Sequence, residues 1–104
     1  MTDLIRSRDA QEEVEELVEY TKKRWGDLQA AKYVDLIESA ERTIASNPKC
    51  GQVLDHMRPD IRYYRLGRSG NSAAHILFYK ITSSGTVRIL HILHEKRDFD
   101  RYFR

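Results

Sequence analysis

The residues best suited to chemistry are cationic and aromatic side chains in the second half of the chain. Arg and Lys can stabilise the charge that develops on a phosphate, and His or Tyr can transfer a proton, so together they are the minimal set for metal-free RNA cleavage. The same side chains can instead hold an acidic peptide or part of an acidic partner protein, and a third interpretation is ordinary surface charge. Residue types alone do not separate these three functions. The group consists of Arg62, Tyr63, Tyr64, Arg65, Arg68, Tyr79, Arg88, His91, Lys96, Arg97, Arg101 and Tyr102.

The sequence contains no pattern typical of another kind of catalytic site or of a metal site. His91 and His94 lie three positions apart in a predicted strand, so their side chains point to opposite faces and do not share one metal ion. We expect His91 to be packed and hydrogen-bonded in the sheet and His94 to close the strand. Cys50 is the only cysteine, and there is no HExxH, GxSxG or phosphate-loop pattern. The sequence therefore predicts no metal and no cofactor.

Length and composition predict one domain spanning residues 1–104. A chain of 104 residues, 40% hydrophobic and 33% charged, can bury one core and keep a charged surface. Its apolar runs are shorter than the roughly 18 residues that span a bilayer, and its first residues lack a signal-peptide core, so we expect neither membrane association nor secretion. An unpaired Cys50 fits a reducing compartment, and we expect the protein to be cytoplasmic.

The charge is unevenly distributed along the chain. Residues 1–47 carry a net negative charge and residues 48–104 a net positive one, although the whole chain is only +2. Such a polarised surface favours an acidic partner. The same pattern also fits salt-bridged helices and arginines that protect strand edges from aggregation. Charge alone therefore does not identify a partner.

Two helices are predicted in the first half. One covers about residues 9–25 with Asp9 as its cap, and the other about residues 28–46 with Asp27 as its cap. Gly26 ends the first helix, and the short turn forces the two into an antiparallel hairpin. Trp25 and Tyr33 flank this turn; we expect both in the core, and the alternative is an aromatic pair that binds a partner. The apolar stripes that predict the helices are Ala10, Val14, Leu17, Val18, Thr21 and Trp25, then Ala30, Tyr33, Val34, Ile37, Ala40, Ile44 and Ala45.

Strands are predicted before and after these helices. A short strand covers about residues 3–6, and a loop covers residues 49–60. Residues 61–67 read as a strand with Arg62, Tyr64 and Leu66 on one face. After a flexible connection at residues 68–73, two apolar runs joined by SSG predict a largely buried β-hairpin over residues 75–94, and a short helix or turn could follow at residues 99–104. The fold class is α+β: an N-terminal strand, an antiparallel helical hairpin and a three-stranded antiparallel sheet, in the order β-α-α-β-β-β with helices on one face.

The motifs WG, QA, NP, FY and ILH follow one another along nearly the whole chain. In this order and spacing they resemble the ParE branch of the ParE/RelE superfamily, the toxic halves of bacterial toxin–antitoxin pairs. The positions that carry the resemblance are Ala10, Glu13, Val14, Leu17, Tyr20, Trp25, Gly26, Gln29, Ala30, Tyr33, Ile37, Asn47, Pro48, Gly51, Arg62, Leu66, Gly67, 75–79, 88–94 and Asp98.

The resemblance implies a toxin that acts by binding. ParE relatives are held by a cognate antitoxin of the ParD kind and usually poison DNA gyrase. RelE relatives instead cleave messenger RNA in the ribosome, with a basic residue on the middle strand, further basic residues after the last strand and a C-terminal Tyr. Ile76 occupies the middle-strand position here and cannot stabilise a phosphorane, which favours the gyrase-directed, non-enzymatic function. We expect no membrane partner and no sequence-specific binding to nucleic acid.

Two groups of site residues follow from the resemblance, and neither includes a catalytic residue. An acidic, partly disordered antitoxin segment is expected to fold into the groove between helices and sheet. The antitoxin-binding group is Arg62, Arg65, Tyr79 and Arg88, and the target-binding group is Lys96, Arg97, Arg101 and Tyr102. One alternative is a ribosome-dependent ribonuclease that uses Arg65, Lys96, Arg97 and Tyr102. Another is a non-toxic relative that retains antitoxin binding.

Overall fold

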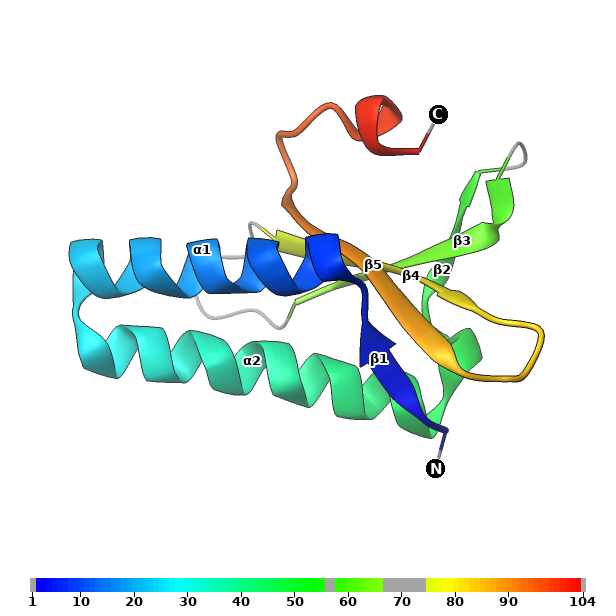
Figure 1. The fold of residues 1–104 in the computed structure, drawn as a ribbon, viewed down its shortest axis with the longest axis horizontal. Helices are drawn as coiled ribbons and strands as arrows, with labels where there is room; N and C mark the ends of the chain where they lie inside the picture. Colours follow the sequence, from blue (N-terminus) through cyan, green and yellow to red (C-terminus); the bar gives the residue numbers. More distant parts are fainter. Residues whose placement is uncertain (1, 56–57, 67–74, 104) are drawn as a thin grey trace.

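The computed structural model describes residues 2–55, 58–66 and 75–103. Both helices lie over one face of a five-stranded sheet, and a short 3₁₀ helix lies on the other face (Figure 1), which confirms the α+β class. The predicted flexible connection at residues 68–73, with Arg68, lies outside the described residues. The elements are β1 (Leu4–Arg6), α1 (Arg8–Trp25), α2 (Asp27–Ser46), η1 (Pro48–Cys50), β2 (Gln52–Asp55), β3 (Arg58–Arg65), β4 (His75–Ile81), β5 (Val87–His94) and η2 (Phe99–Tyr102).

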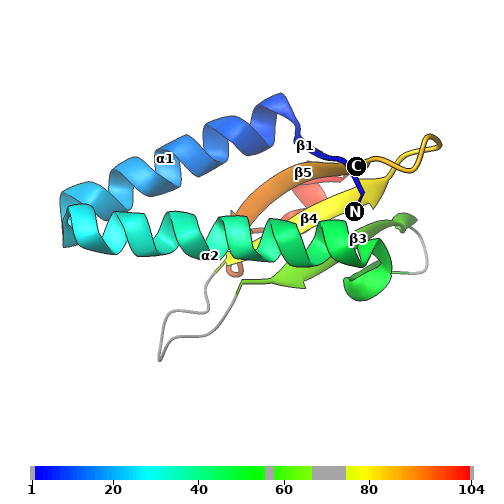
Figure 2. The ribbon, with the colours of Figure 1, turned by 90° about the horizontal axis from the view of Figure 1, so that it is seen from below.

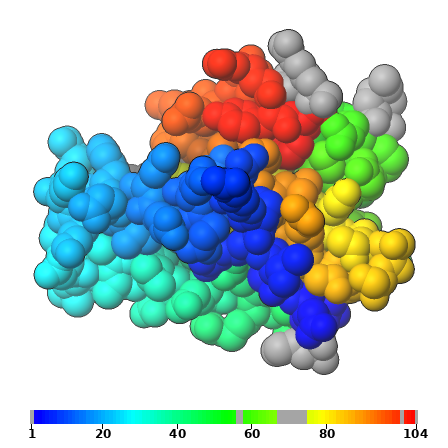
Figure 3. Space-filling model, viewed as in Figure 1, coloured from blue at the N-terminus to red at the C-terminus, as the bar shows by residue number. Residues whose placement is uncertain are grey.

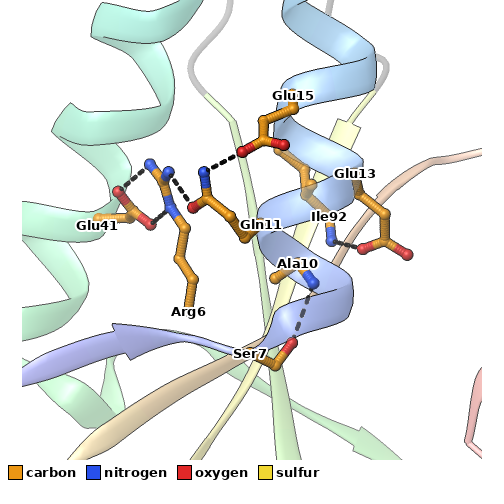
Figure 4. Close-up of polar contacts among 8 residues, drawn as sticks. All are labelled: Arg6, Ser7, Ala10, Gln11, Glu13, Glu15, Glu41 and Ile92. Atoms are coloured by element: carbon orange, nitrogen blue, oxygen red, sulfur yellow. Dashed lines mark hydrogen bonds and ion pairs between the residues drawn. The ribbon is translucent and has the colours of Figure 1, made fainter.

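The residue that caps the start of α1 is Ser7, not Asp9 as predicted. Ser7 Oγ accepts a hydrogen bond from the backbone N–H of Ala10 at 3.0 Å, and Asp9 lies inside the first turn (Figure 4). The Ser7 hydroxyl also donates to the carbonyl of Leu90 in β5 at 2.9 Å. Serine accepts from the helix and donates to the sheet at once, which Asp9 could not do. The prediction of Asp9 as cap was therefore wrong.

The turn between the helices is a single glycine. Gly26 has φ 95°, a left-handed conformation that favours glycine, and its N–H bonds the carbonyl of Lys22 at 2.9 Å. Asp27 is already the first residue of α2, so its predicted role as a cap was wrong. The antiparallel hairpin itself is confirmed, and Figure 2 shows α1 and α2 running back along each other.

The apolar stripe of α2 is confirmed, because the residues predicted to face the core are buried, except Val34, which is half-buried. In α1, Ala10, Val14 and Thr21 are buried and the leucine and valine between them are half-buried. Trp25 is the exception. It is 65% exposed, so its predicted place in the core was wrong.

The sheet has the order β1-β5-β4-β3-β2. Strands β2 to β5 pair antiparallel, as predicted for the last three, but β1 runs parallel to β5 with Leu4 opposite Val87. The loop predicted at residues 49–60 instead contains η1, β2 and the start of β3. β2 is only four residues long, too short for its alternation to be recognised in the sequence.

Apolar layers cover both faces of the sheet. The larger layer lies between the helices and the sheet and includes Ile37, Ile44, Leu77, Tyr79 and Ile89. The second layer lies on the outer face, where Phe99, Tyr102 and Phe103 of the C-terminal tail cover Ile61, Ile76, Phe78 and Leu93. Strands β4 and β5 are therefore buried on both sides, which explains their nearly continuous apolar sequence.

An ion pair fixes β1 against α2. Arg6 donates two hydrogen bonds to the carboxylate of Glu41, at 2.7 and 2.9 Å, and a third to Gln11 at 3.1 Å (Figure 4). The bonds to Glu41 raise the pKa of Arg6. A bidentate pair of this kind fixes the orientation of the two side chains as well as their distance. It therefore holds β1, the edge strand of the sheet, against α2.

A buried tyrosine connects the end of α2 to the sheet. Tyr79 Oη donates to the carbonyl of Pro48 at 2.7 Å and accepts from the N–H of Gly51 at 2.9 Å. A Cβ on Gly51 would lie 2.5 Å from this hydroxyl, so glycine is required by the close approach.

We predict that Tyr79→Phe lowers the free energy of unfolding by about 1–3 kcal/mol, because it leaves the buried Gly51 N–H without an acceptor. Urea denaturation of both proteins measures the difference. Tyr63→Phe is the matched control, because its hydroxyl donates to Gln52 at the surface and its loss should change stability by less than about 0.5 kcal/mol. Equal stability of the two variants would contradict this role of Tyr79.

Candidate functional site

A groove of about 700 Å³ opens between the far half of the helical hairpin and the end of the sheet. Mostly apolar side chains line it, with two histidines at the sheet side. A smaller pocket of about 420 Å³ adjoins it toward the C-terminal tail and shares Leu17, Tyr20, His75 and His94 with it. We call the larger space the hairpin groove; its lining is Leu17, Tyr20, Thr21, Trp25, Gln29, Tyr33, His75 and His94. We call the smaller space the tail pocket; its other lining residues are Glu13, Glu16, Ile92, Leu93, Arg97 and Tyr102.

Large apolar side chains are exposed around the turn of the helical hairpin, and two of them, Tyr20 and Trp25, form the rim of the hairpin groove. Tyr20, Trp25 and Leu28 are 60%, 65% and 73% exposed. They lie near the turn that joins α1 to α2, which projects beyond the sheet (Figure 1; blue to cyan in Figure 3). A cluster of exposed aromatic and aliphatic residues beside a groove is typical of a protein-binding surface.

Two histidines and a tyrosine form the sheet side of the groove. Tyr33 Oη lies 2.6 Å from His75 Nδ1, and the ring of His94 stands edge-on to His75 with centroids 5.3 Å apart. Burial, with the neighbouring His94, lowers the pKa of His75 to about 4, and burial raises the pKa of Tyr33 to about 12. Both groups are therefore neutral near pH 7, and a hydrogen bond joins them.

The predicted antitoxin-binding residues do not form one surface. Arg62 donates to the carbonyls of Gly51 and Lys49 at 2.8 and 3.3 Å, and Tyr79 is fully buried. Arg65 is exposed, pairs with Glu95 at 3.2 Å and precedes Leu66, whose N–H bonds the carbonyl of the groove residue His75. Arg88 is exposed six residues before His94 on β5, about 20 Å away along the strand.

The predicted target-binding residues lie together in the C-terminal tail. Arg97 and Tyr102 line the tail pocket, whereas Lys96 and Arg101 are exposed beside it in the chain. The ring of Tyr102 stands edge-on to His91 with centroids 5.0 Å apart. Tyr102 therefore belongs both to the pocket wall and to the outer apolar layer.

Glu13 joins α1 to β5, a role that the sequence did not predict. Its carboxylate accepts the N–H of Ile92 at 2.9 Å (Figure 4). The carboxylate also lies 2.9 Å from His91 Nδ1. His91 is thus half-buried and hydrogen-bonded, and His94 ends β5, as predicted. Among the described residues no three His, Cys, Asp or Glu side chains are placed to hold a metal ion, and neither helix is long and apolar enough to cross a membrane.

The rim of the hairpin groove was not predicted as a site. Tyr20 and Leu28 lie outside the apolar stripes of their helices, and the sequence favours Trp25 as a core residue over the alternative of partner binding. The available signal was the concentration of three large apolar residues within nine positions around a glycine turn. A hairpin that extends beyond the sheet leaves such residues without a packing partner.

We predict that His75 makes the protein less stable as the pH falls from about 6.5 to 4. The unfolded chain takes up a proton at the ordinary histidine pKa, whereas the folded state does so only near pH 4, so protonation favours unfolding in this interval. His75→Asn keeps an acceptor for Tyr33 but does not titrate, and should reduce the loss by roughly 1–2 kcal/mol. Urea denaturation at both ends of the interval measures it. Parallel pH profiles for the two proteins would contradict this assignment.

Comparison with known proteins agrees with the predicted family. The family described as ParE toxin of type II toxin-antitoxin system, parDE, matches residues 4–99. The chain is 36% identical over 92 residues to Toxin ParE1 of Mycobacterium tuberculosis H37Rv, covering 88% of each chain. It is 32% identical over 89 residues to Toxin ParE1 of Caulobacter vibrioides, covering 86% of this chain and 84% of that one.

A solved structure supports the fold. The chromosomal ParDE toxin–antitoxin system from P. aeruginosa contains a chain with a TM-score of 0.73 to this one at 19% identity, covering 90% of this chain and 96% of the other. The structural similarity supports the fold alone, whereas the family match along residues 4–99 and the two ParE1 relatives identify the family. The protein belongs to the ParE toxin family of type II toxin–antitoxin systems.

Proposed function

We propose that this ParE-family toxin acts in the cytoplasm by binding and poisoning DNA gyrase, and that a ParD-like antitoxin neutralises it. The observation that carries the proposal is the hairpin groove with its exposed rim, a surface suited to a protein partner. Membership of the ParE family supports gyrase as the target, because poisoning of gyrase is the action that the family resemblance implies.

The antitoxin occupies the hairpin groove in this proposal. A disordered segment can fold on binding and place its apolar side chains between Tyr20, Trp25 and Tyr33. Arg65 is the exposed cation of the predicted antitoxin group that lies beside the groove. It precedes Leu66, whose N–H bonds the carbonyl of the groove residue His75. Arg62 already bonds two carbonyls, Tyr79 is buried, and Arg88 is distant, so we leave these three out of the antitoxin surface.

We predict that Trp25→Ala weakens antitoxin binding by about tenfold or more, because truncation of a central aromatic residue usually costs over 1 kcal/mol. Calorimetric titration with the purified cognate antitoxin measures the affinity. Val53→Ala is the control, since Val53 is also exposed but lies on β2 at the opposite edge of the sheet. An equal loss in both variants, or none in Trp25→Ala, would remove the antitoxin from this groove.

A ribonuclease is the second candidate, and one observation favours it. Arg97 and Tyr102 line the same pocket as His75 and His94, which gathers a cation, a hydroxyl and two imidazoles. Against it, Ile76 at the middle-strand position is 3% exposed under the tail, and Arg65 is paired with Glu95. We therefore assign the tail residues Lys96, Arg97, Arg101 and Tyr102 to target contacts without catalysis.

We predict that purified protein makes gyrase accumulate cleaved DNA and that the antitoxin suppresses this. Tyr102→Phe keeps the ring that packs on His91 and removes only the hydroxyl, so gyrase poisoning and growth inhibition should persist. Supercoiling and cleavage assays, together with inducible expression, measure both. If Tyr102→Phe abolishes toxicity while gyrase is unaffected by the parent protein, a ribonuclease is the correct function. Normal growth without antitoxin would indicate a non-toxic relative.

A further inference from the structure

The end of the β4–β5 hairpin carries positive charge and no negative charge. No Asp or Glu occurs between His75 and His94, and the two cations of this stretch, Lys80 and Arg88, stand directly opposite each other across the strands. Both project from the outer face, because the neighbouring Tyr79 and Ile89 belong to the layer under the helices. We call residues 80–88 the cationic finger.

This cation pair is unfavourable for the isolated protein. Like charges directly opposite each other on one face of an antiparallel pair repel. Neither Lys80 nor Arg88 has an ion-pair partner among the described residues. Protection of a sheet edge does not account for them, since β4 and β5 are interior strands. An anion bound between the two cations would remove the repulsion.

The turn of the finger adds hydrogen-bonding groups that suit a phosphate. Residues 82–86 read TSSGT, and Ser83, Ser84 and Gly85 are exposed. The hydroxyls of Thr82 and Ser84 lie 3.0 Å apart, and the N–H of Thr86 bonds Thr82 Oγ1 at 3.2 Å. Small hydroxyl side chains and backbone N–H groups beside Lys and Arg are the usual partners of nucleic-acid phosphates.

The surroundings leave the finger accessible. It projects past the neighbouring strands in both views (yellow to orange in Figures 1 and 2). On the β1 side, Ile5 stands opposite Arg88 and is half exposed. Asp3 bonds to the finger only through its backbone carbonyl, which accepts the N–H of Val87 at 2.9 Å, as far as the described residues show.

We propose that the cationic finger binds the phosphate backbone of duplex DNA, without sequence preference. The choice of duplex DNA rests on the proposed function, because gyrase holds such DNA, whereas the fit to phosphate rests on the finger itself. The finger lies about 20 Å along β5 from the groove residue His94, so DNA and the antitoxin would occupy different surfaces.

The test is fluorescence anisotropy of a short labelled duplex with the full chain, in the absence of gyrase and over a series of salt concentrations. The variant is Lys80→Gln with Arg88→Gln. The control is Lys32→Gln with Arg42→Gln, which removes the same two charges from exposed positions of α2 that have no ion pair among the described residues. A second variant, Ser83→Asp with Ser84→Asp, adds charge to the turn and leaves the strands intact.

We predict that the parent protein and the control bind duplex DNA with the same salt dependence. In the finger variant the slope of log affinity against log salt should fall by about 2, one for each lost phosphate contact. The aspartate variant should also bind more weakly. Absence of DNA binding, equal losses in variant and control, or tighter binding to single-stranded RNA of the same length would overturn the inference.

The result also separates this inference from the proposed function. Gyrase poisoning by a protein that does not bind DNA would overturn the role of the finger and leave the proposed function intact. DNA binding that depends on Lys80 and Arg88 would support the finger even if gyrase were not inhibited.

Discussion

The burial of β4 and β5 on both faces is the constraint on which the rest of the structure depends. Helices α1 and α2 cover one face and the aromatic tail covers the other, so Phe78 and Tyr79, neighbours in the chain, belong to different apolar layers. Two interior strands without a polar face cannot be stable alone. The helical hairpin and the tail are therefore both required to exclude water from the sheet. Glu13 ties α1 to β5 through His91 and Ile92, and Tyr102 of the tail packs on the ring of His91.

The surfaces available for function are those that this packing does not bury. The helical hairpin extends past the sheet, and its far half exposes Tyr20, Trp25 and Leu28. The opposite end of the sheet ends in the β4–β5 turn, where the side chains become polar and cationic.

The sequence predicted the elements that depend on neighbouring residues, and it missed those that depend on the whole fold. Periodicity located both helices, and the apolar runs located the β4–β5 hairpin. It did not reveal that Ser7 caps α1, because the choice depends on its bond to Leu90 in a distant strand. It placed Trp25 in the core, because a helical stripe cannot show where the sheet beneath it ends. β1 pairs parallel to β5, and Phe103 packs on the outer face of the sheet. Both are tertiary contacts that no local sequence pattern predicts.

The central claim is that this protein acts by binding and that its partner protein occupies the hairpin groove. Amide hydrogen exchange of the full chain, free and saturated with its antitoxin, tests this claim most directly. We expect slower exchange on binding around the turn between α1 and α2, and unchanged exchange in the turn at residues 82–86. Protection confined to the β4–β5 turn, with no change near Trp25, would contradict it.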